Sequence, residues 1–169
     1  RFIRDRYVFT GWRRSRPVSE FGVLEQLHAA GLPVPEPVAA MVRRRGLVYT
    51  GALMTLRIDD VSPLADELEA RAGDTIFWRS VGACIRRFHD HGVVHADLNA
   101  RNILVGGDRV YLIDFDRARI KSGSHSAFRR NLARLRRSLD KFWPTSTASA
   151  HEEDWNALLA AYAGGNQHA

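Results

Sequence analysis

The chain has 169 residues, of which 45% are hydrophobic and 9% aromatic, so it can build a buried core and is not a disordered segment. Its formal net charge of +6 and pI of about 10.2 favour an anionic partner: nucleic acid, a phosphorylated small molecule or a membrane surface. Its single cysteine excludes an intramolecular disulfide and a cysteine-rich metal site, and no apolar run approaches the ~20 residues of a membrane helix. We therefore expect a reducing compartment and, at most, peripheral membrane contact.

The first third of the chain predicts one helix followed by a hairpin. Apolar residues at helical spacing predict a helix over residues 17–30, which Gly31 ends. After a proline-rich segment, residues 37–42 and 47–58 read as two strands joined by a basic RRRG turn. The polar IDDVSP then marks a hinge between two subregions.

The remainder predicts mostly helices around a second hairpin. Ser62 is expected to cap a short helix that starts at Pro63, and the apolar spacing over 74–91 predicts a helix that faces the core. The runs ILV and VYLI, joined by GGDR, predict a β-hairpin, and two further amphipathic helices follow it. Together these elements indicate an α+β fold.

Residues of catalytic type gather in HGVVHADLNARNILV, residues 91–105. This run contains H-x-D-x-x-x-x-N as His95, Asp97 and Asn102, and Asp114 follows twelve residues after Asn102, at the end of an apolar strand. This order matches the template for phosphoryl transfer, in which a loop aspartate accepts the proton of the acceptor hydroxyl while an asparagine and a second aspartate hold Mg²⁺. The motif alone arises by chance, but its position between a helix and a hairpin favours a kinase-like site.

The longer segments resemble a known family. HGVVHADLNARNILV and VYLIDFDRARI, with SEFGVLEQLHAAGLPVPEPVAA before them and RRNLARLRRSL after them, are similar to the bacterial 3-deoxy-D-manno-octulosonic acid (Kdo) kinases of the lipopolysaccharide kinase family. The resemblance covers about residues 4–139 and implies a two-lobed protein-kinase-like fold of the α+β class. Residues 1–57 would form a partial small lobe, and residues 58–169 the large catalytic lobe.

The resemblance also assigns roles to single residues. Asp97 matches the catalytic base, and His95 matches the structural histidine of the catalytic loop. Asn102 and Asp114 match the residues that bind the cofactors, ATP with Mg²⁺, as metal ligands. Glu20 matches the glutamate that pairs with the lysine that positions ATP; without the resemblance it reads as a solvated helix charge.

The resemblance further implies a substrate and a location. Members of the family phosphorylate a Kdo hydroxyl on Kdo-bearing lipid A precursor at the cytoplasmic face of the bacterial inner membrane. We therefore expect peripheral contact with anionic membrane, no nucleic-acid partner and no protein substrate. The basic helix FRRNLARLRRSLDK suits anionic lipid or the phosphates of the acceptor, and equally suits an arginine-rich solvent face.

Several positions depart from the protein-kinase pattern. No lysine precedes Lys121 and no glycine-rich strand pair precedes Glu20, so the small lobe is expected to be truncated at its N-terminus; the alternative is a pseudokinase. Asp116 replaces the glycine of D-F-G, Asn99 stands where many protein kinases have lysine, and no A-P-E follows. These differences argue against a protein acceptor.

Other functions remain open from the sequence. A small-molecule kinase of the aminoglycoside or choline type uses the same H-x-D-x-x-x-x-N motif, and an atypical kinase associated with tRNA modification would suit the basic charge. A non-catalytic basic binding module that keeps a degenerate kinase site is the alternative from another class. The sequence lacks a recognised nucleic-acid motif, and Asp97, Asn102 and Asp114 are all present.

Overall fold

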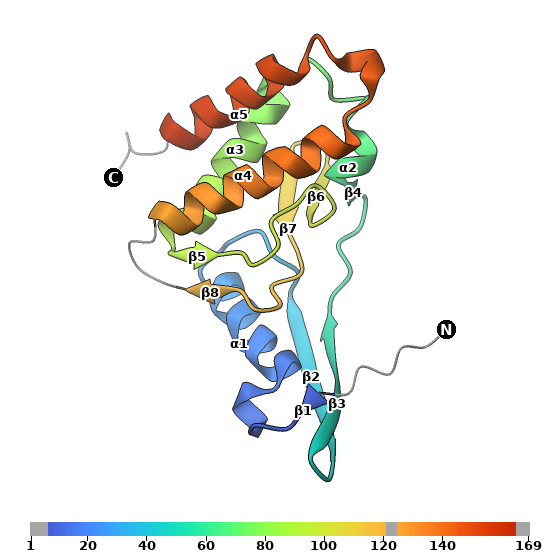
Figure 1. Cartoon of the computed structure of the whole chain (residues 1–169), viewed down its shortest axis with the longest axis vertical. Coiled ribbons are helices and arrows are strands. Elements are labelled where there is room, and N and C mark those ends of the chain that lie inside the picture. The colour runs from blue at the N-terminus through green and yellow to red at the C-terminus, as the bar shows by residue number, and fades with distance from the viewer. Residues whose placement is uncertain (1–6, 121–124, 165–169) are drawn as a thin grey trace.

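The computed structural model describes residues 7–120 and 125–164, which form two parts joined by an extended segment (Figure 1). The lower part in Figure 1 holds α1 and the strands β1 to β3, and the upper part holds the remaining helices and short strands. Residues 56–61 between them form neither helix nor strand. The predicted lobe boundary between residues 57 and 58 lies in this segment, and the division into domains stays a prediction.

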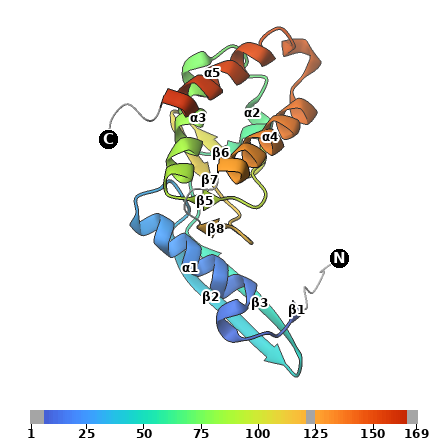
Figure 2. The same cartoon turned by 60° about the vertical axis from the view of Figure 1, so that its left-hand side comes forward.

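The smaller part is one helix on a three-stranded sheet. The helix α1 (Arg16–Ala29) follows the short turn η1 (Trp12–Arg14), has proline in its first turn and buries Leu24 and Leu27. It lies along the sheet, whose strand order is β1 (Tyr7–Val8), β3 (Val48–Thr55) and β2 (Pro37–Arg45) (Figure 2). The predicted helix and hairpin are thus confirmed.

The turn of this hairpin differs from the prediction. Arg45 pairs with Val48, so β2 includes the arginines that the sequence assigned to a turn, and the chain reverses at Gly46 and Leu47. Gly46 has a φ of 61°, a left-handed conformation that glycine adopts without strain. Arg43 to Arg45 are exposed, and exposed strand positions tolerate charged side chains.

The larger part is built around α3 (Thr75–Asp90). Asp74 caps this helix by accepting a hydrogen bond of 3.0 Å from the backbone N–H of Phe77. α3 packs against α5 (His151–Gly164), and α4 (His125–Phe142) follows the second sheet region. The largest fully buried side chains of the core belong mainly to this part: Trp78, Phe88, Phe115, Leu64, Leu68, Ile85, Leu98, Ile103, Leu112, Leu135 and Leu139.

Short strands complete the larger part. The predicted hairpin is confirmed as β6 (Ile103–Gly106) and β7 (Arg109–Leu112), with β4 (Ser62–Pro63) on the other side of β6. β5 (Val93–Val94) pairs with β8 (Arg119–Ile120), and η2 (Thr145–Thr147) precedes α5. The predicted cap at Ser62 is wrong: Ser62 pairs with Val105, and the short helix α2 (Leu64–Glu67) begins after Pro63 without a side-chain cap.

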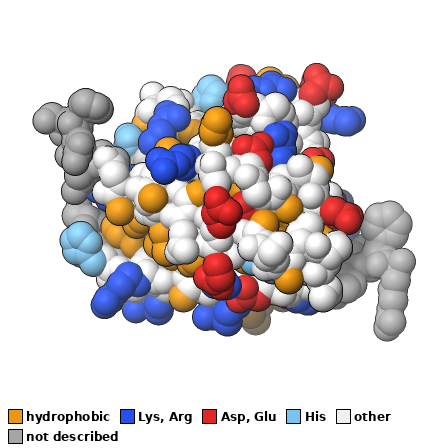
Figure 3. Space-filling view, turned by 90° about the horizontal axis from the view of Figure 1, so that it is seen from above, with side chains coloured by type: hydrophobic (Ala, Val, Ile, Leu, Met, Phe, Trp, Pro, Cys, Tyr) orange, Lys and Arg blue, Asp and Glu red, His pale blue; other side chains and the backbone are white. Residues whose placement is uncertain are grey.

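No helix among the described residues has both the length and the apolar character needed to cross a membrane. On the face seen from above, Lys and Arg side chains line the lower edge and appear again near the upper edge, while Asp and Glu side chains lie from the upper edge through the middle (Figure 3). Side chains of both charges are therefore present on this face.

Candidate active site

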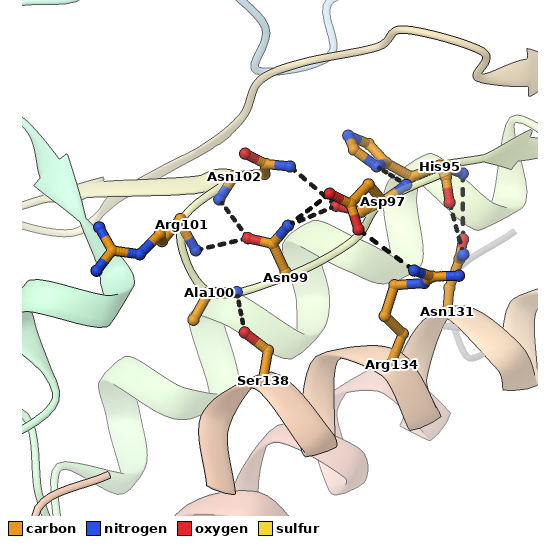
Figure 4. A network of polar contacts seen from close by, with 9 residues as sticks. All are labelled: His95, Asp97, Asn99, Ala100, Arg101, Asn102, Asn131, Arg134 and Ser138. Atoms are coloured by element: carbon orange, nitrogen blue, oxygen red, sulfur yellow. Dashed lines mark hydrogen bonds and ion pairs between the residues drawn. The ribbon is translucent and has the colours of Figure 1, made fainter. Parts of the chain in front are cut away.

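The candidate catalytic residues lie on the loop 95–102, which connects β5 to β6 (Figure 4). The side chain of Asn99 organises this loop: its Oδ1 accepts hydrogen bonds from the backbone N–H groups of Arg101 (2.8 Å) and Asn102 (3.1 Å). Its Nδ2 donates to the backbone oxygen of Asp97 (3.1 Å) and to Oδ2 of the same residue (3.0 Å). The residue that replaces the protein-kinase lysine therefore holds the shape of the loop.

His95 stabilises this loop through hydrogen bonds of both ring nitrogens. Its side chain is buried, with 2% exposed, and its Nδ1 accepts a hydrogen bond of 3.1 Å from the backbone N–H of Asp97. Its Nε2 lies 3.0 Å from the backbone oxygen of Ile113, which only accepts, so Nε2 carries the proton. Burial lowers the pKa of His95, which favours this neutral form. His95 thus positions Asp97 and links its loop to the strand that precedes Asp114.

Asp97 itself is exposed to solvent, as a group that meets a substrate must be. Its Oδ1 lies 3.3 Å from Nη1 of Arg134 on α4, and its Oδ2 accepts the hydrogen bond from Asn99. The carboxylate is therefore held from two sides while its outer face stays open. A base in this setting is oriented before a substrate arrives.

The helix α4 supplies contacts that the sequence did not predict. The buried side chain of Asn131 accepts a hydrogen bond from the backbone N–H of His95 (3.1 Å) and donates one to its backbone oxygen (2.7 Å). Ser138 Oγ accepts a hydrogen bond of 3.1 Å from the backbone N–H of Ala100. A signal existed in the sequence, because Asn131 is a polar residue on the face of α4 that buries Phe128 and Leu135.

Asp114 is brought to the loop by a main-chain contact. The backbone N–H of Ile113 donates a hydrogen bond of 3.0 Å to the backbone oxygen of Asn102, so the two predicted metal ligands lie on adjoining segments. Asp114 has a φ of 62°, a left-handed conformation that costs a residue with a Cβ roughly 1 kcal/mol. This bend turns the chain out of β7 directly at the candidate site.

A pocket of about 360 Å³ lies between the two parts of the chain and contains Glu20 and Asp114. Burial raises the pKa of Glu20, and the nearby charge of Asp114 raises it further, while a hydrogen bond from the backbone of Phe115 opposes the shift. The structure therefore brings Glu20 together with Asp114. The remaining residues that line the pocket come from both parts and the segment between them: Leu24, Pro35, Leu53, Thr55, Leu56, Arg57, Ile58, Val61, Leu104 and Ile113.

The oxygen donors near this pocket fit Mg²⁺. Asn102 uses its Nδ2 to donate to the backbone oxygen of Asp97 (2.9 Å), which turns its Oδ1 away from the loop (Figure 4). That oxygen and the exposed carboxylate of Asp114 are hard ligands, the type that Mg²⁺ prefers. The described residues contain no group of three or more His, Cys, Asp or Glu that could hold a metal alone. Two protein ligands suit a metal that phosphates and waters complete.

Comparison with known proteins identifies the family. The lipopolysaccharide kinase (Kdo/WaaP) family matches residues 1–162. The chain is 42% identical over 163 residues to a 3-deoxy-D-manno-octulosonic acid kinase of Xanthomonas campestris pv. campestris (strain B100), covering 96% of this chain and 65% of the relative. It is 41% identical over 160 residues to a protein of the same name from Xylella fastidiosa (strain M12), covering 94% of this chain and 64% of the relative. A protein of that name from Haemophilus influenzae (strain PittEE) is 36% identical over 165 residues, covering 94% and 68%.

The fold is shared with a solved structure. The structure of WaaP in complex with acyl carrier protein matches with a TM-score of 0.64 and 19% identity, covering 86% of this chain and 65% of that one. At this identity the likeness shows the kinase-like fold alone. The chain spans 64% of the length of the Xylella relative and 65% of the Xanthomonas relative. With its α+β kinase-like fold and its match over 1–162, the chain belongs to the lipopolysaccharide kinase (Kdo/WaaP) family.

Proposed function

We propose that the protein transfers the γ-phosphoryl group of ATP to a hydroxyl of Kdo on Kdo-bearing lipid A precursor. One observation carries this proposal: the hydrogen bond from Ile113 to Asn102 joins the loop of Asp97 to the strand that delivers Asp114. Asp114 and Ile113 also line the pocket, so this contact connects the loop of Asp97 and Asn102 to the pocket wall. Phosphoryl transfer depends mainly on such positioning and on neutralisation of charge.

The pocket supports ATP as the donor. Leu24 and Leu53 from one part and Leu104 from the other provide apolar side chains, which suit a flat purine ring. Glu20 and Asp114 lie in the same pocket, and such carboxylates support binding of a triphosphate that carries a metal cation. Bound Mg²⁺ would neutralise charge on the phosphates, with Asn102 and Asp114 as its protein ligands.

Asp97 supports a hydroxyl as the acceptor. Its open carboxylate orients the acceptor hydroxyl and takes its proton, which adds ~10²-fold or more to the rate in such reactions. Ten residues, 115–124, separate Asp114 from α4, which leaves little room for the peptide-docking segment of a protein kinase. We therefore propose a small or lipid-linked acceptor, with neither a protein nor a nucleic acid as substrate.

The relatives support Kdo as the acceptor sugar. Three proteins that are 36–42% identical to this chain are named 3-deoxy-D-manno-octulosonic acid kinase. We propose the same activity for the full-length protein to which this chain corresponds. The substrate carries a lipid, so we also propose peripheral binding at the cytoplasmic face of the bacterial inner membrane.

The activity is tested by transfer of labelled phosphate from ATP to Kdo-bearing lipid A precursor by the full-length protein. Asp97→Asn keeps the size of the side chain and removes its basicity, so labelling should fall by ~10²-fold or more. Glu153→Gln, at an exposed position on α5, is the matched control and should label normally. Labelling of an aminoglycoside or choline in place of the Kdo acceptor would overturn the assignment, as would equal activity of Asp97→Asn.

Membrane binding is tested by sedimentation of the full-length protein with phospholipid vesicles. Vesicles that contain phosphatidylglycerol should retain the protein at low salt and release it at high salt, while vesicles of phosphatidylcholine alone should not retain it. Equal retention by both vesicles, or by neither, would contradict an electrostatic contact with the membrane.

A further inference from the structure

Arg134 lies beside the candidate base Asp97, and the proposed phosphoryl transfer gives it no role. Arg134 lies on α4 and places its Nη1 3.3 Å from Oδ1 of Asp97. The side chains of Arg134 and Asp97 are 49% and 58% exposed, so both meet solvent at the same place. Within the part of the chain that the structure describes, this is the one polar contact of the Arg134 side chain.

The contact is too weak to explain the arginine as a structural element. An exposed ion pair of this kind contributes about 0–1 kcal/mol. α4 is already fixed against the loop by the hydrogen bonds of Asn131 and Ser138 and by the buried side chains of Leu135 and Leu139. The position of α4 therefore does not depend on Arg134.

Other basic residues extend the positive charge from this point. Arg130, Arg137 and Lys141 are exposed and recur at spacings of three and four residues with Arg134, which places all of them on one side of α4. Arg136 is different, because it pairs with Asp140 (2.7 Å) and Glu152 (2.5 Å). The basic side of α4 thus extends along the helix in both directions from the arginine that contacts the candidate base.

A guanidinium has five N–H donors in a planar fork, which matches the two oxygens of a carboxylate or the oxygens of a phosphate. Arg134 uses one donor for Asp97, so donors remain for a second oxyanion next to the carboxylate. An octulosonic acid carries a carboxylate on the same sugar as its hydroxyls, and a lipid A precursor carries phosphates.

We propose that Arg134 bridges Asp97 and an oxyanion of the acceptor, and so selects anionic acceptors over neutral ones. This inference rests on the proposed function. It assigns Arg134 as a specificity-determining residue: it holds the acceptor by its negative charge while Asp97 takes the proton of the hydroxyl. The oxyanion is supplied either by the sugar carboxylate or by a phosphate of the lipid.

The test compares three acceptors with the full-length protein: the Kdo-bearing lipid A precursor, its methyl ester at the Kdo carboxyl, and the precursor without its phosphates. For each, kcat/KM is measured with the wild type, Arg134→Ala and Arg134→Lys. Arg129→Ala is the matched control, because Arg129 is exposed on α4 and lies five residues away, about 140° around the helix.

If the carboxylate is the ligand, the wild type should prefer the acid over the ester by about 10- to 100-fold, the range for a charge-assisted hydrogen bond. Arg134→Ala should reduce this preference to within about threefold, and Arg134→Lys should restore part of it. Arg129→Ala should show the same preference as the wild type. The KM for ATP should not change. If a phosphate is the ligand, the wild type should prefer the phosphorylated precursor over the precursor without phosphates, and the variants should change that preference in the same way.

The outcomes separate the two proposals. If the wild type labels the acceptor but Arg134→Ala keeps the wild-type preference in both comparisons, Arg134 does not bind the acceptor and the inference is wrong. An equal loss of kcat on every acceptor would assign Arg134 to the positioning of Asp97 alone and would also overturn it. If the wild type labels no Kdo acceptor, the proposed function fails and this inference fails with it.

Discussion

Arg16, at the start of α1, forms a two-point ion pair with Asp116, two residues beyond Asp114. Nε of Arg16 donates to Oδ1 of Asp116 at 2.9 Å, and a terminal nitrogen of the same guanidinium contacts Oδ2. Nη1 of Arg16 also donates to the hydroxyl of Tyr7 (2.7 Å). The helix that carries Glu20 is thereby tied to the segment that carries Asp114.

This pair should be measurable as a coupling between the two parts of the fold. The side chains are 35% and 22% exposed, so solvent screens the pair and we expect a coupling of about 1 kcal/mol. A double-mutant cycle of Arg16→Ala and Asp116→Ala, followed by urea denaturation, measures it. The coupling should shrink at high salt. A coupling near zero at low salt would mean that the contact does not hold the two parts together.

Asn131→Leu should destabilise the protein by about 2–4 kcal/mol. The substitution keeps the branched shape and the number of side-chain heavy atoms but leaves the buried backbone N–H and oxygen of His95 without their partners, and each unsatisfied group costs about 1–3 kcal/mol. Urea denaturation measures the free energy of unfolding. Asn156→Leu, at an exposed position of α5, controls for the change in helix propensity and should be nearly neutral. Wild-type stability of Asn131→Leu would show that the loop does not depend on this amide.

His89, which also contacts Asn131, should make the stability of the protein depend on pH. Nε2 of His89 lies 3.4 Å from Oδ1 of Asn131, which accepts, and Nδ1 lies 2.7 Å from the hydroxyl of Tyr162, which must donate. Burial lowers the pKa of His89 from 6.5 to about 4, so the folded protein holds it neutral. The unfolded chain binds this proton below about pH 6.5, whereas the folded chain does so only near pH 4.

The contribution of His89 is therefore complete above pH 6.5 and is lost as the pH falls towards 4. Over that window the free energy of unfolding should drop by about 3 kcal/mol more in the wild type than in His89→Gln. Urea denaturation at pH 7, 5.5 and 4.5 gives the difference between the two proteins. The exposed neighbour His91, changed to Gln, should leave the wild-type slope in place. Parallel curves for the wild type and His89→Gln would refute a neutral buried imidazole.

Gly82→Ala should destabilise the contact between α3 and α5. A Cβ at Gly82 would overlap the backbone oxygen of Leu158, and backbone cannot move as a flexible side chain can. We expect a cost of about 1–3 kcal/mol in the free energy of unfolding. Gly22→Ala in α1 meets open space and should stabilise the protein by about 0.5–1 kcal/mol, because glycine is a poor helix former. Equal effects of the two substitutions would mean that α3 and α5 are not closely packed at Gly82.

The parts of the fold that the sequence predicted correctly are those with a local pattern. α3 repeats its apolar residues every three or four positions, and the hairpin of β6 and β7 reverses at Gly107 and Asp108, within the predicted GGDR turn. The strands β5 and β8 were missed, because two residues show no alternation and Val93 finds its partner Ile120 far along the chain. Ser62 has the composition of a helix cap, but pairing with Val105 determines its conformation.

In the candidate site, too, the residues within a local motif could be predicted and the long-range contacts could not. The spacing of Asp97, Asn102 and Asp114 is a motif of the primary structure, and the structure brings these residues to adjoining segments. The contributions of Arg134 and Ser138 could not be predicted, since helical periodicity gives the faces of α4 but not the loop against which a face packs. Arg16 pairs with Asp116 a hundred residues later, and no local pattern contains that contact.

The hydrogen bonds between α4 and the loop also determine the stage of protein synthesis at which the candidate site can form. His95 and Ala100 rely on Asn131 and Ser138, which follow them by 36 and 38 residues. The ribosome synthesises the chain from its N-terminus. Asp97, Asn102 and Asp114 therefore emerge before α4 is available to shape their loop. The candidate site is thus completed only when this late helix docks, so a partly synthesised chain would not contain the assembled loop.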